Sequence, residues 1–247
     1  MEKGLAKSRS QAQQIIQAGL VLIDGRTASK ASAEFSGDIT IEITDDRMNR
    51  YVSRGGLKLE GALRHTGIRV DGIRALDVGI STGGFTDCLL QAGAAEIVGV
   101  DVGQGQLSPK ISSDPRVKIF ESVNARELTP SLIESPKPFD LAVVDVSFIS
   151  LELILPPVTS LIAADGKILA LVKPQFEAGR AALGKTGVVK DPKAFEEVRK
   201  KIYKICELNR LDVEDYFESA ITGTDGNQEF FLLARPFGIR ERVSTST

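Results

Sequence analysis

From residue 74 onward the chain alternates between two hydrophobic patterns. Short, nearly unbroken apolar runs, typical of strands buried on both faces, are separated by longer segments with apolar residues at helical spacing. The runs predict strands at 74–79, 96–102, 117–120, 139–147, 166–173, 211–221 and 228–236. The segments between them predict helices at 83–93, near 150–163 and at 191–208. This alternation indicates an α/β fold with a mostly parallel sheet.

The N-terminal residues have a different pattern, which predicts a small separate module. A helix is expected at 8–19, where serines can cap the start and a glycine ends the apolar face. The strand at 20–26 contains Asp24-Gly25, a hairpin signal, and 38–43 alternates like a half-exposed strand. A segment of this length buries little core, so we interpret it as a satellite module.

Composition narrows the classes of protein. The 247 residues are 42% hydrophobic and 26% charged, ordinary globular values, and no apolar run is long enough to span a bilayer. The net charge of −2 argues against a protein that coats nucleic acid indiscriminately. A single histidine excludes a His-rich metal site. Two distant cysteines in apolar helical patterns are expected to be buried thiols in the reducing cytoplasm.

A nucleotide-binding βαβ unit is predicted where a buried strand ends in Asp77. A glycine-containing turn then opens a helix, and Asp101 ends the next strand, 24 residues after Asp77. An acid at that second position can accept hydrogen bonds from ribose hydroxyls. The phosphate fingerprint G-x-G-x-x-G is absent. A ligand without pyrophosphate and with a cationic centre facing Asp77 fits better, and S-adenosylmethionine is such a ligand.

A second motif, at residues 179–186, matches the P-loop pattern G-x-x-x-x-G-K-[ST]. That motif binds phosphate between a strand directly before it and a helix that starts at its Lys-Thr. Here Pro174 and residues 175–178 separate it from the strand, and Pro192 delays the helix. We therefore do not expect ATP or GTP binding.

Four charged residues fall where a parallel sheet places its chemistry, at the carboxyl ends of strands. Asp145 and Lys173 each end a predicted strand. Glu229 begins the last strand, and Lys58 lies in a glycine-rich lead into a helix. Each alone is compatible with a surface charge or a snorkelling lysine. Two lysines and two carboxylates meeting in one cleft instead indicate catalysis, because a lysine held by acids can take a proton from a hydroxyl.

These four residues, in this order, resemble the K-D-K-E tetrad of FtsJ-type 2′-O-ribose RNA methyltransferases. Several longer segments are similar to the TlyA (hemolysin A-like) branch of that family, which carries an N-terminal S4 RNA-binding domain. The similar segments are 4–26, which matches an S4 core, and 77–94, 143–151, 171–180 and 187–192.

The resemblance implies a Rossmann-like methyltransferase fold, with a seven-stranded, mostly parallel sheet whose last strand is antiparallel. It also implies the division of the chain. The expected parts are an S4-like α+β RNA-binding module, short at its N-terminus, over 1–46; a linker and lead-in helix carrying Lys58 over 47–73; an FtsJ-like domain over 74–240; and a loose tail over 241–247.

By the same resemblance, the activity would be S-adenosylmethionine-dependent methylation of cytidine ribose in ribosomal RNA. Lys173 would be the general base, with Asp145 and Lys58 orienting and tuning it and Glu229 completing the network. The implied cofactor-binding residues are Asp77, Gly79, Ser81, Gly83, Gly84, Asp101, Val102 and Asn124. Of these, Ser81, Gly83 and Gly84 would line the methionine end, Asp101 would hold the ribose, and Asn124 would lie near the adenine. The implied RNA contacts are Arg9, Arg26 and Lys30.

Ribosomal RNA or a ribosomal subunit is the expected partner, with no metal and no membrane. Two alternatives stay open. One is an RNA-binding ribosome-assembly factor whose cofactor site is vestigial, and the other is a membrane-active hemolysin. The residues do not distinguish which nucleotide or subunit is modified.

Overall fold

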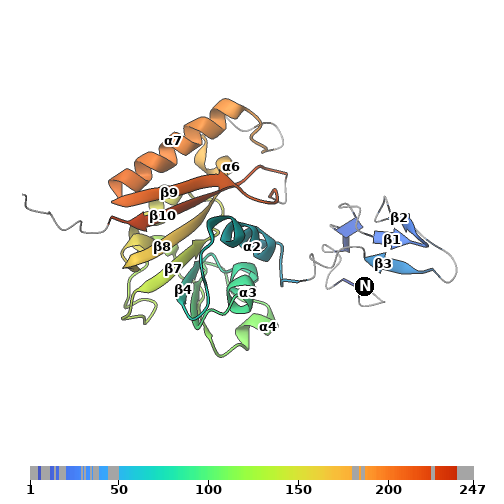
Figure 1. Cartoon of the computed structure of the whole chain (residues 1–247), viewed down its shortest axis with the longest axis horizontal. Coiled ribbons are helices and arrows are strands. Elements are labelled where there is room, and N and C mark those ends of the chain that lie inside the picture. Colours follow the sequence, from blue (N-terminus) through green and yellow to red (C-terminus); the bar gives the residue numbers. More distant parts are fainter. Residues whose placement is uncertain are drawn as a thin grey trace, which may run out of the picture.

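In the computed structural model of the chain, strands form two sheets, a small one near the N-terminus and a large one after residue 73 (Figure 1). The residues that the structure describes are 5, 6, 12, 13, 15, 16, 21–28, 30, 32, 33, 35, 39–43, 50–179, 184, 187–223 and 226–237.

The small sheet contains the predicted hairpin. Strand β1 (Val21–Ile23) lies between β2 (Arg26–Thr27) and β3 (Ile41–Ile43), and both neighbours are antiparallel to it. The turn residues Asp24 and Gly25 have φ angles of 49° and 76°. Positive φ at both positions is what an Asp-Gly hairpin turn requires, so the sequence signal and the observed turn agree.

The predicted helix at 8–19 is described in part. Its described residues 12, 13, 15 and 16 are helical. Ile15 packs with Val21 and Ala28 in a small cluster of buried side chains. A core of this size matches the expectation of a satellite module with little apolar burial.

The large sheet has seven strands in the order β6-β5-β4-β7-β8-β10-β9. The first five in this order are parallel to their neighbours, whereas β10 is antiparallel to both β8 and β9. The predicted mostly parallel sheet with an antiparallel last strand is confirmed. Its strands are β4 (Arg74–Val78), β5 (Glu96–Val100), β6 (Val117–Phe120), β7 (Phe139–Val144), β8 (Ile162–Val172), β9 (Leu211–Glu218) and β10 (Phe230–Pro236).

Helices cover both faces of this sheet (Figure 1). Alternate residues of a strand point to opposite faces, and β8 shows this directly. Ile168, Ala170 and Val172 pack in one cluster with α5 and α7, and Leu169 and Leu171 pack in another with α2 and α3. The helices are α2 (Gly55–Thr66), α3 (Gly84–Gln91), α4 (Pro109–Ser112), η2 (Ala125–Glu127), η3 (Leu151–Leu153), α5 (Leu155–Thr159), α6 (Pro174–Glu177) and α7 (Pro192–Leu208).

One expected helix is shorter than the hydrophobic pattern suggested. Instead of a helix near 150–163, the chain forms the single turn η3, then α5, and enters β8 at Ile162. The prolines Pro156 and Pro157 lie in the first turn of α5. Proline is tolerated only there because it lacks a backbone N–H, so the helix cannot extend back through them to residue 150.

Gly79 brings two loops of the sheet into contact. It follows β4, has a φ of 86°, and a Cβ at this position would overlap the carbonyl oxygen of Asp145 and lie 2.9 Å from its carbonyl carbon. The contact arises because β4 and β7 are neighbouring parallel strands, with Val78 opposite Val144. Gly79 therefore fixes the approach of the loop that carries Asp145.

Gly79→Ala should destabilise the fold more than Gly72→Ala. Gly72 also has a positive φ, 74°, but no atom lies within 4 Å of its Cβ position. The Gly72 variant therefore measures left-handed backbone strain alone, about 1–2 kcal/mol. Overlap with Asp145 should add about 1–3 kcal/mol for Gly79→Ala. Urea unfolding followed by circular dichroism measures both losses, and equal values would show that the loop relaxes freely.

Candidate active site

The four predicted catalytic residues form two ion pairs at one end of the large sheet. Lys173 Nζ lies 2.6 Å from Asp145 Oδ1, and Lys58 Nζ lies 2.5 Å from Glu229 Oε2. Each pair joins segments that are distant in sequence. The two pairs are neighbours, because the β8–β10 register places Phe230 opposite Val172 and so continues to Glu229 and Lys173.

Lys173 is held by the segment that follows β7. Besides the Asp145 carboxylate, its ammonium donates a hydrogen bond of 2.8 Å to the Ser147 hydroxyl. It also lies 5.9 Å from the centre of the Phe176 ring, within cation–π range. Its side chain is only 11% exposed, so the amine has a fixed position with limited access to water.

Lys58 and Glu229 form the more buried of the two pairs. Their side chains are 11% and 3% exposed, and Lys58 is held by the first turns of α2. Gly223 packs against the same carboxylate, since a Cβ there would lie 2.7 Å from Glu229 Oε1. A buried charge is costly unless it is paired, which explains why this lysine and this acid occur together.

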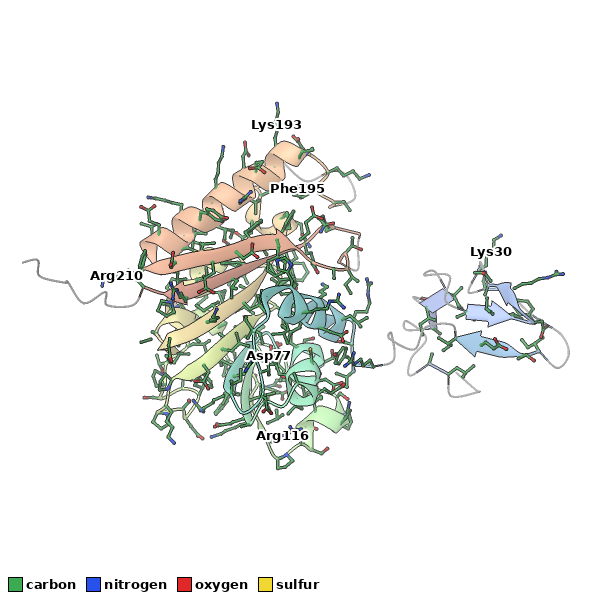
Figure 2. The ribbon with its side chains drawn as sticks, in the orientation of Figure 1. Lys30, Asp77, Arg116, Lys193, Phe195 and Arg210 are labelled. Carbon is green, nitrogen blue, oxygen red and sulfur yellow. The ribbon has the colours of Figure 1, made fainter. Side chains whose placement is uncertain are left out.

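Asp77 lies inside the fold, at the end of β4 (Figure 2). Its carboxyl is fully buried, and Oδ2 accepts a hydrogen bond of 2.6 Å from the Thr86 hydroxyl. Among the described residues, Oδ1 has no hydrogen-bond partner. Burial raises the pKa of the Asp77 carboxyl to about 7, the Thr86 hydrogen bond opposes the shift, and the charges of Asp145 and Asp101 add to it. An unpartnered acceptor amid acidic groups suits a cationic ligand.

Asp101 organises the loop that follows β5. Its two carboxylate oxygens accept hydrogen bonds from the backbone N–H groups of Ser81, at 2.8 Å, and Gly103, at 2.7 Å. Each oxygen keeps a free lone pair for a ribose hydroxyl. The neighbouring Val102 side chain is 76% exposed, and its position on the rim is open to a ligand.

Asn124 lies next to this loop. The backbone N–H of Val123 donates to the Asp101 carbonyl at 2.9 Å. The Asn124 side chain caps η2 by accepting from the Arg126 N–H at 3.1 Å. The residues predicted for the ribose and the adenine are thus adjacent.

The two glycines at the start of α3 have close protein neighbours. A Cβ on Gly83 would lie 2.9 Å from Leu107, and one on Gly84 would overlap the Ser53 hydroxyl and lie 3.1 Å from the Gly56 nitrogen. These glycines allow α3 to approach α2 and the 107–111 segment. Their predicted contact with the methionine end of the cofactor stays a prediction.

The predicted RNA contacts and the P-loop-like sequence lie outside this cluster of residues. Arg26 and Lys30 are exposed on the N-terminal module, where Figure 2 shows Lys30 pointing outward. Arg9 lies outside the described residues, as do 180–183, 185 and 186 of the P-loop-like sequence.

Two further structural findings bear on the expectations. Both cysteines are free and buried, as predicted. In the parts of the chain that the structure describes, no cluster of metal-ligand side chains occurs and no helix is long and apolar enough to cross a membrane.

Sequence reasoning missed two polar partners at this site, Thr86 and Ser147. Thr86 lies in the first turn of α3 and bonds Asp77, and Ser147 bonds Lys173. Ser147 follows Asp145 by two positions, the spacing that places two side chains on the same side of an extended segment. That spacing is a usable signal, whereas the Thr86 contact depends on how α3 packs on β4.

A family model for FtsJ-like methyltransferases matches residues 51–235, and a model for S4 domains matches residues 2–37. The chain belongs to the FtsJ-like methyltransferase family. It is therefore a methyltransferase, of a family that depends on S-adenosylmethionine, with an S4 domain at its N-terminus.

Two relatives that align with this chain over most of their own length support this family assignment. The protein named 16S/23S rRNA (cytidine-2′-O)-methyltransferase TlyA of Mycobacterium tuberculosis is 44% identical over 236 residues, covering 95% of this chain and 87% of the relative. Hemolysin A of Brachyspira hyodysenteriae is 37% identical over 229 residues, covering 92% of this chain and 94% of the relative.

Solved structures agree with the fold. A candidate hemolysin from Streptococcus thermophilus has a TM-score of 0.78 and 37% identity, covering 99% of this chain and 89% of that one. A candidate S-adenosylmethionine-dependent methyltransferase from Listeria monocytogenes has a TM-score of 0.53 and 12% identity, covering 74% of this chain and 98% of that one. The second likeness concerns the fold of the methyltransferase domain alone.

Asp77→Asn should change how the stability of this methyltransferase depends on pH. Between the ordinary value of 3.8 and the raised pKa of about 7, the Asp77 carboxyl is protonated in the folded chain and ionised in the unfolded one. The free energy of unfolding therefore falls as pH rises through this window. Asparagine cannot ionise and can still accept a hydrogen bond from Thr86. The free energy of unfolding of Asp77→Asn, relative to wild type, should therefore rise by about 2–4 kcal/mol as pH increases through this window.

Urea unfolding at several pH values across this window measures the effect. The exposed Asp165 provides a control, since Asp165→Asn should give a nearly constant difference from wild type. A constant difference for Asp77→Asn as well would contradict the raised pKa.

Proposed function

We propose that this chain transfers a methyl group from S-adenosylmethionine to the ribose 2′-oxygen of cytidine in ribosomal RNA. The observation that carries the proposal is the Lys173–Asp145 ion pair at the ends of β8 and β7, beside the Lys58–Glu229 pair. The name of the M. tuberculosis relative, which specifies a cytidine 2′-oxygen in rRNA, supports the same substrate.

The proposed cofactor cradle consists of the turn after β4 and the loop after β5. S-adenosylmethionine supplies an electrophilic methyl group on a sulfonium, so the protein has to align and deprotonate the acceptor. Asp77 would face the cationic end and Asp101 the ribose, with Asn124 near the adenine. The cradle is completed by Gly79, Ser81, Gly83, Gly84 and Val102.

Lys173 would act as the general base. In its neutral form, Nζ would accept the proton of the 2′-hydroxyl while that oxygen takes the methyl group, and the methyl–sulfur bond would break to leave a neutral thioether. The resulting ammonium lies against the Asp145 carboxylate, 2.6 Å away, and donates to Ser147, 2.8 Å away. These acceptors stabilise the positive charge that forms on the amine during transfer. Lys58 and Glu229 would orient the acceptor ribose beside them.

The S4 domain would hold the RNA. Arg26 and Lys30 are exposed there and can contact phosphates, which give affinity without sequence selection. Arg9 is proposed for the same role from its place in the sequence. Binding on one domain would present the nucleotide to a site on the other.

Lys173→Ala and Lys173→Arg should both lower methyl transfer at least about 100-fold, the range attributed to general acid–base catalysis. Alanine removes the amine. Arginine keeps the charge but stays protonated, so it cannot serve as a base. The affinity for S-adenosylmethionine should change little, because Nζ is aimed at the acceptor hydroxyl. Single-turnover transfer of labelled methyl to ribosomal RNA, followed by nuclease digestion, gives both rate and position.

A matched control lies on the same strand. Lys167 lies in the middle of β8, six residues before Lys173, and pairs with Glu214 at 2.6 Å, so Lys167→Arg should keep the wild-type rate. Substantial activity in Lys173→Arg would leave Lys173 as a positioning charge only, and a methyl group found on a base would exclude the ribose target. Wild-type activity in Lys173→Ala would overturn the proposed catalytic role.

Charge removal on the S4 domain should weaken RNA binding without affecting the cofactor. The double variant Arg26→Gln/Lys30→Gln should bind ribosomal RNA less tightly, and its affinity should depend less steeply on salt because fewer phosphates are neutralised. Filter binding over a salt series measures both effects. Lys137→Gln is the control, since Lys137 is exposed just before β7, at the end of that strand away from Asp145. If RNA affinity depends on salt as steeply in the double variant as in wild type, Arg26 and Lys30 do not contact the RNA phosphates.

A further inference from the structure

A buried carboxylate that the proposed mechanism does not use lies four residues after Lys173. Glu177 ends α6, and its side chain is only 2% exposed. Its Oε1 accepts from the backbone N–H of Leu151 at 2.7 Å, and its Oε2 accepts from the Ser150 hydroxyl at 2.7 Å and from Lys201 Nζ at 2.9 Å. The Lys201 ammonium also donates to the Glu177 carbonyl, at 3.2 Å.

These contacts close a ring that contains the Lys173–Asp145 pair. Asp145 begins the segment 145–151, which leads to η3, and Lys173 begins the segment 173–177, which forms α6. The two segments are joined at one end by the ion pair and at the other by Glu177. Lys201 of α7 then anchors this second joint to the helix layer.

The 145–151 segment needs such a joint because it contains a strained residue. Phe148 has a φ of 63°, in the left-handed region that a bulky side chain rarely adopts. Phe148 is 90% exposed. Its ring lies against the Phe176 ring of α6, with 5.0 Å between the ring centres. Strain of this kind persists only where surrounding contacts determine the backbone. The hydrogen bonds to Ser150 and Leu151 supply those contacts.

The carboxylate of Glu177 has no access to a substrate. It is buried and accepts three hydrogen bonds, two of them from the 145–151 segment. It therefore acts through the groups it holds. A buried ion pair is often no more stabilising than well-packed apolar side chains, so the directional bonds to particular atoms are what this residue adds.

We propose that Glu177 is a positioning residue that sets the geometry of the Lys173–Asp145 pair by tying the segment after β7 to α6 and α7. The inference rests on the proposed function, because it assigns the effect to the base and its carboxylate. Methyl transfer requires an aligned acceptor, and a displacement of about 1 Å can lower a rate about 100-fold.

Glu177→Gln tests this role with little change in size. The amide cannot pair with Lys201 and presents only one acceptor oxygen to the Leu151 N–H and the Ser150 hydroxyl. The single-turnover methyl-transfer rate at saturating S-adenosylmethionine and ribosomal RNA should fall about 10- to 100-fold. The dissociation constants of both ligands should stay within about twofold of wild type, because the Glu177 carboxylate contacts neither ligand. Glu207→Gln is the matched control, since Glu207 pairs with Lys204 on the surface of α7 at 2.9 Å.

Two milder variants keep the test valid if Glu177→Gln does not fold. Ser150→Ala removes one bond to the carboxylate, and Lys201→Met removes its counter-charge. Both should lower the same rate in the same direction, by a smaller factor. Glu177→Asp keeps the charge, but its side chain is one methylene shorter and cannot reach the same atoms. Its methyl-transfer rate should therefore also be lower than that of wild type.

The outcomes separate this proposal from the proposed function. A wild-type rate in Glu177→Gln, or weaker ligand binding that accounts for the whole loss, would overturn the positioning role. Lys173→Ala is measured in parallel. If Lys173→Ala is inactive and Glu177→Gln is fully active, only the positioning role fails. If Lys173→Ala is active, Lys173 is not the base and the proposed catalytic role fails. A lower rate in Glu177→Gln could then not arise through Lys173, so the positioning role would fail as well.

Discussion

The ion pair between Lys173 and Asp145 depends on two strands that run in parallel and end side by side. β7 delivers the carboxylate and β8 the ammonium, and their 2.6 Å contact requires both strand ends to be held in register. Much of the surrounding structure serves that requirement. Gly79 lets the β4 turn touch the Asp145 backbone, and β10 brings Glu229 beside Lys173. Each of these contacts joins parts of the chain that are distant in sequence, so the site exists only in the assembled sheet.

Electrostatics divides the site into two halves with different tasks. The lysines and their carboxylates occupy the half formed by the ends of β7 and β8 with β10 and α2, where charges are paired. Around Asp77 the balance is acidic, and one carboxyl oxygen has no partner among the described residues. A cationic ligand would reduce the electrostatic repulsion in the acidic half around Asp77. The proposed acceptor hydroxyl would lie in the half that contains the lysines. This division would let one fold hold a cationic methyl donor and the proposed lysine base close together with little mutual repulsion.

The fold and the meeting of the four charged residues at one end of the sheet follow largely from local sequence patterns. Apolar runs that stop at a charged residue predicted the ends of β7 and β8, and the Asp-Gly signal predicted the hairpin. The helix near 150–163 was wrong, because Pro156 and Pro157 permit only a short helix that starts beside them. Thr86, Ser147 and Glu177 could not be assigned in advance, because their contacts depend on how helices pack on the sheet. The contacts of the predicted cofactor residues with a ligand stay predictions.

The position of β10 has a consequence for how the enzyme matures. This strand is the last of the seven in sequence, yet it lies between β8 and β9 rather than at an edge. During synthesis, β4 to β8 can emerge and pair while the place of β10 is still empty. Lys58 is then made early but lacks its carboxylate partner, since Glu229 arrives only with that final strand. Strands β4 to β8 would thus emerge from the ribosome before Glu229 does, and a chain that stops short of residue 229 would leave Lys58 without its carboxylate partner.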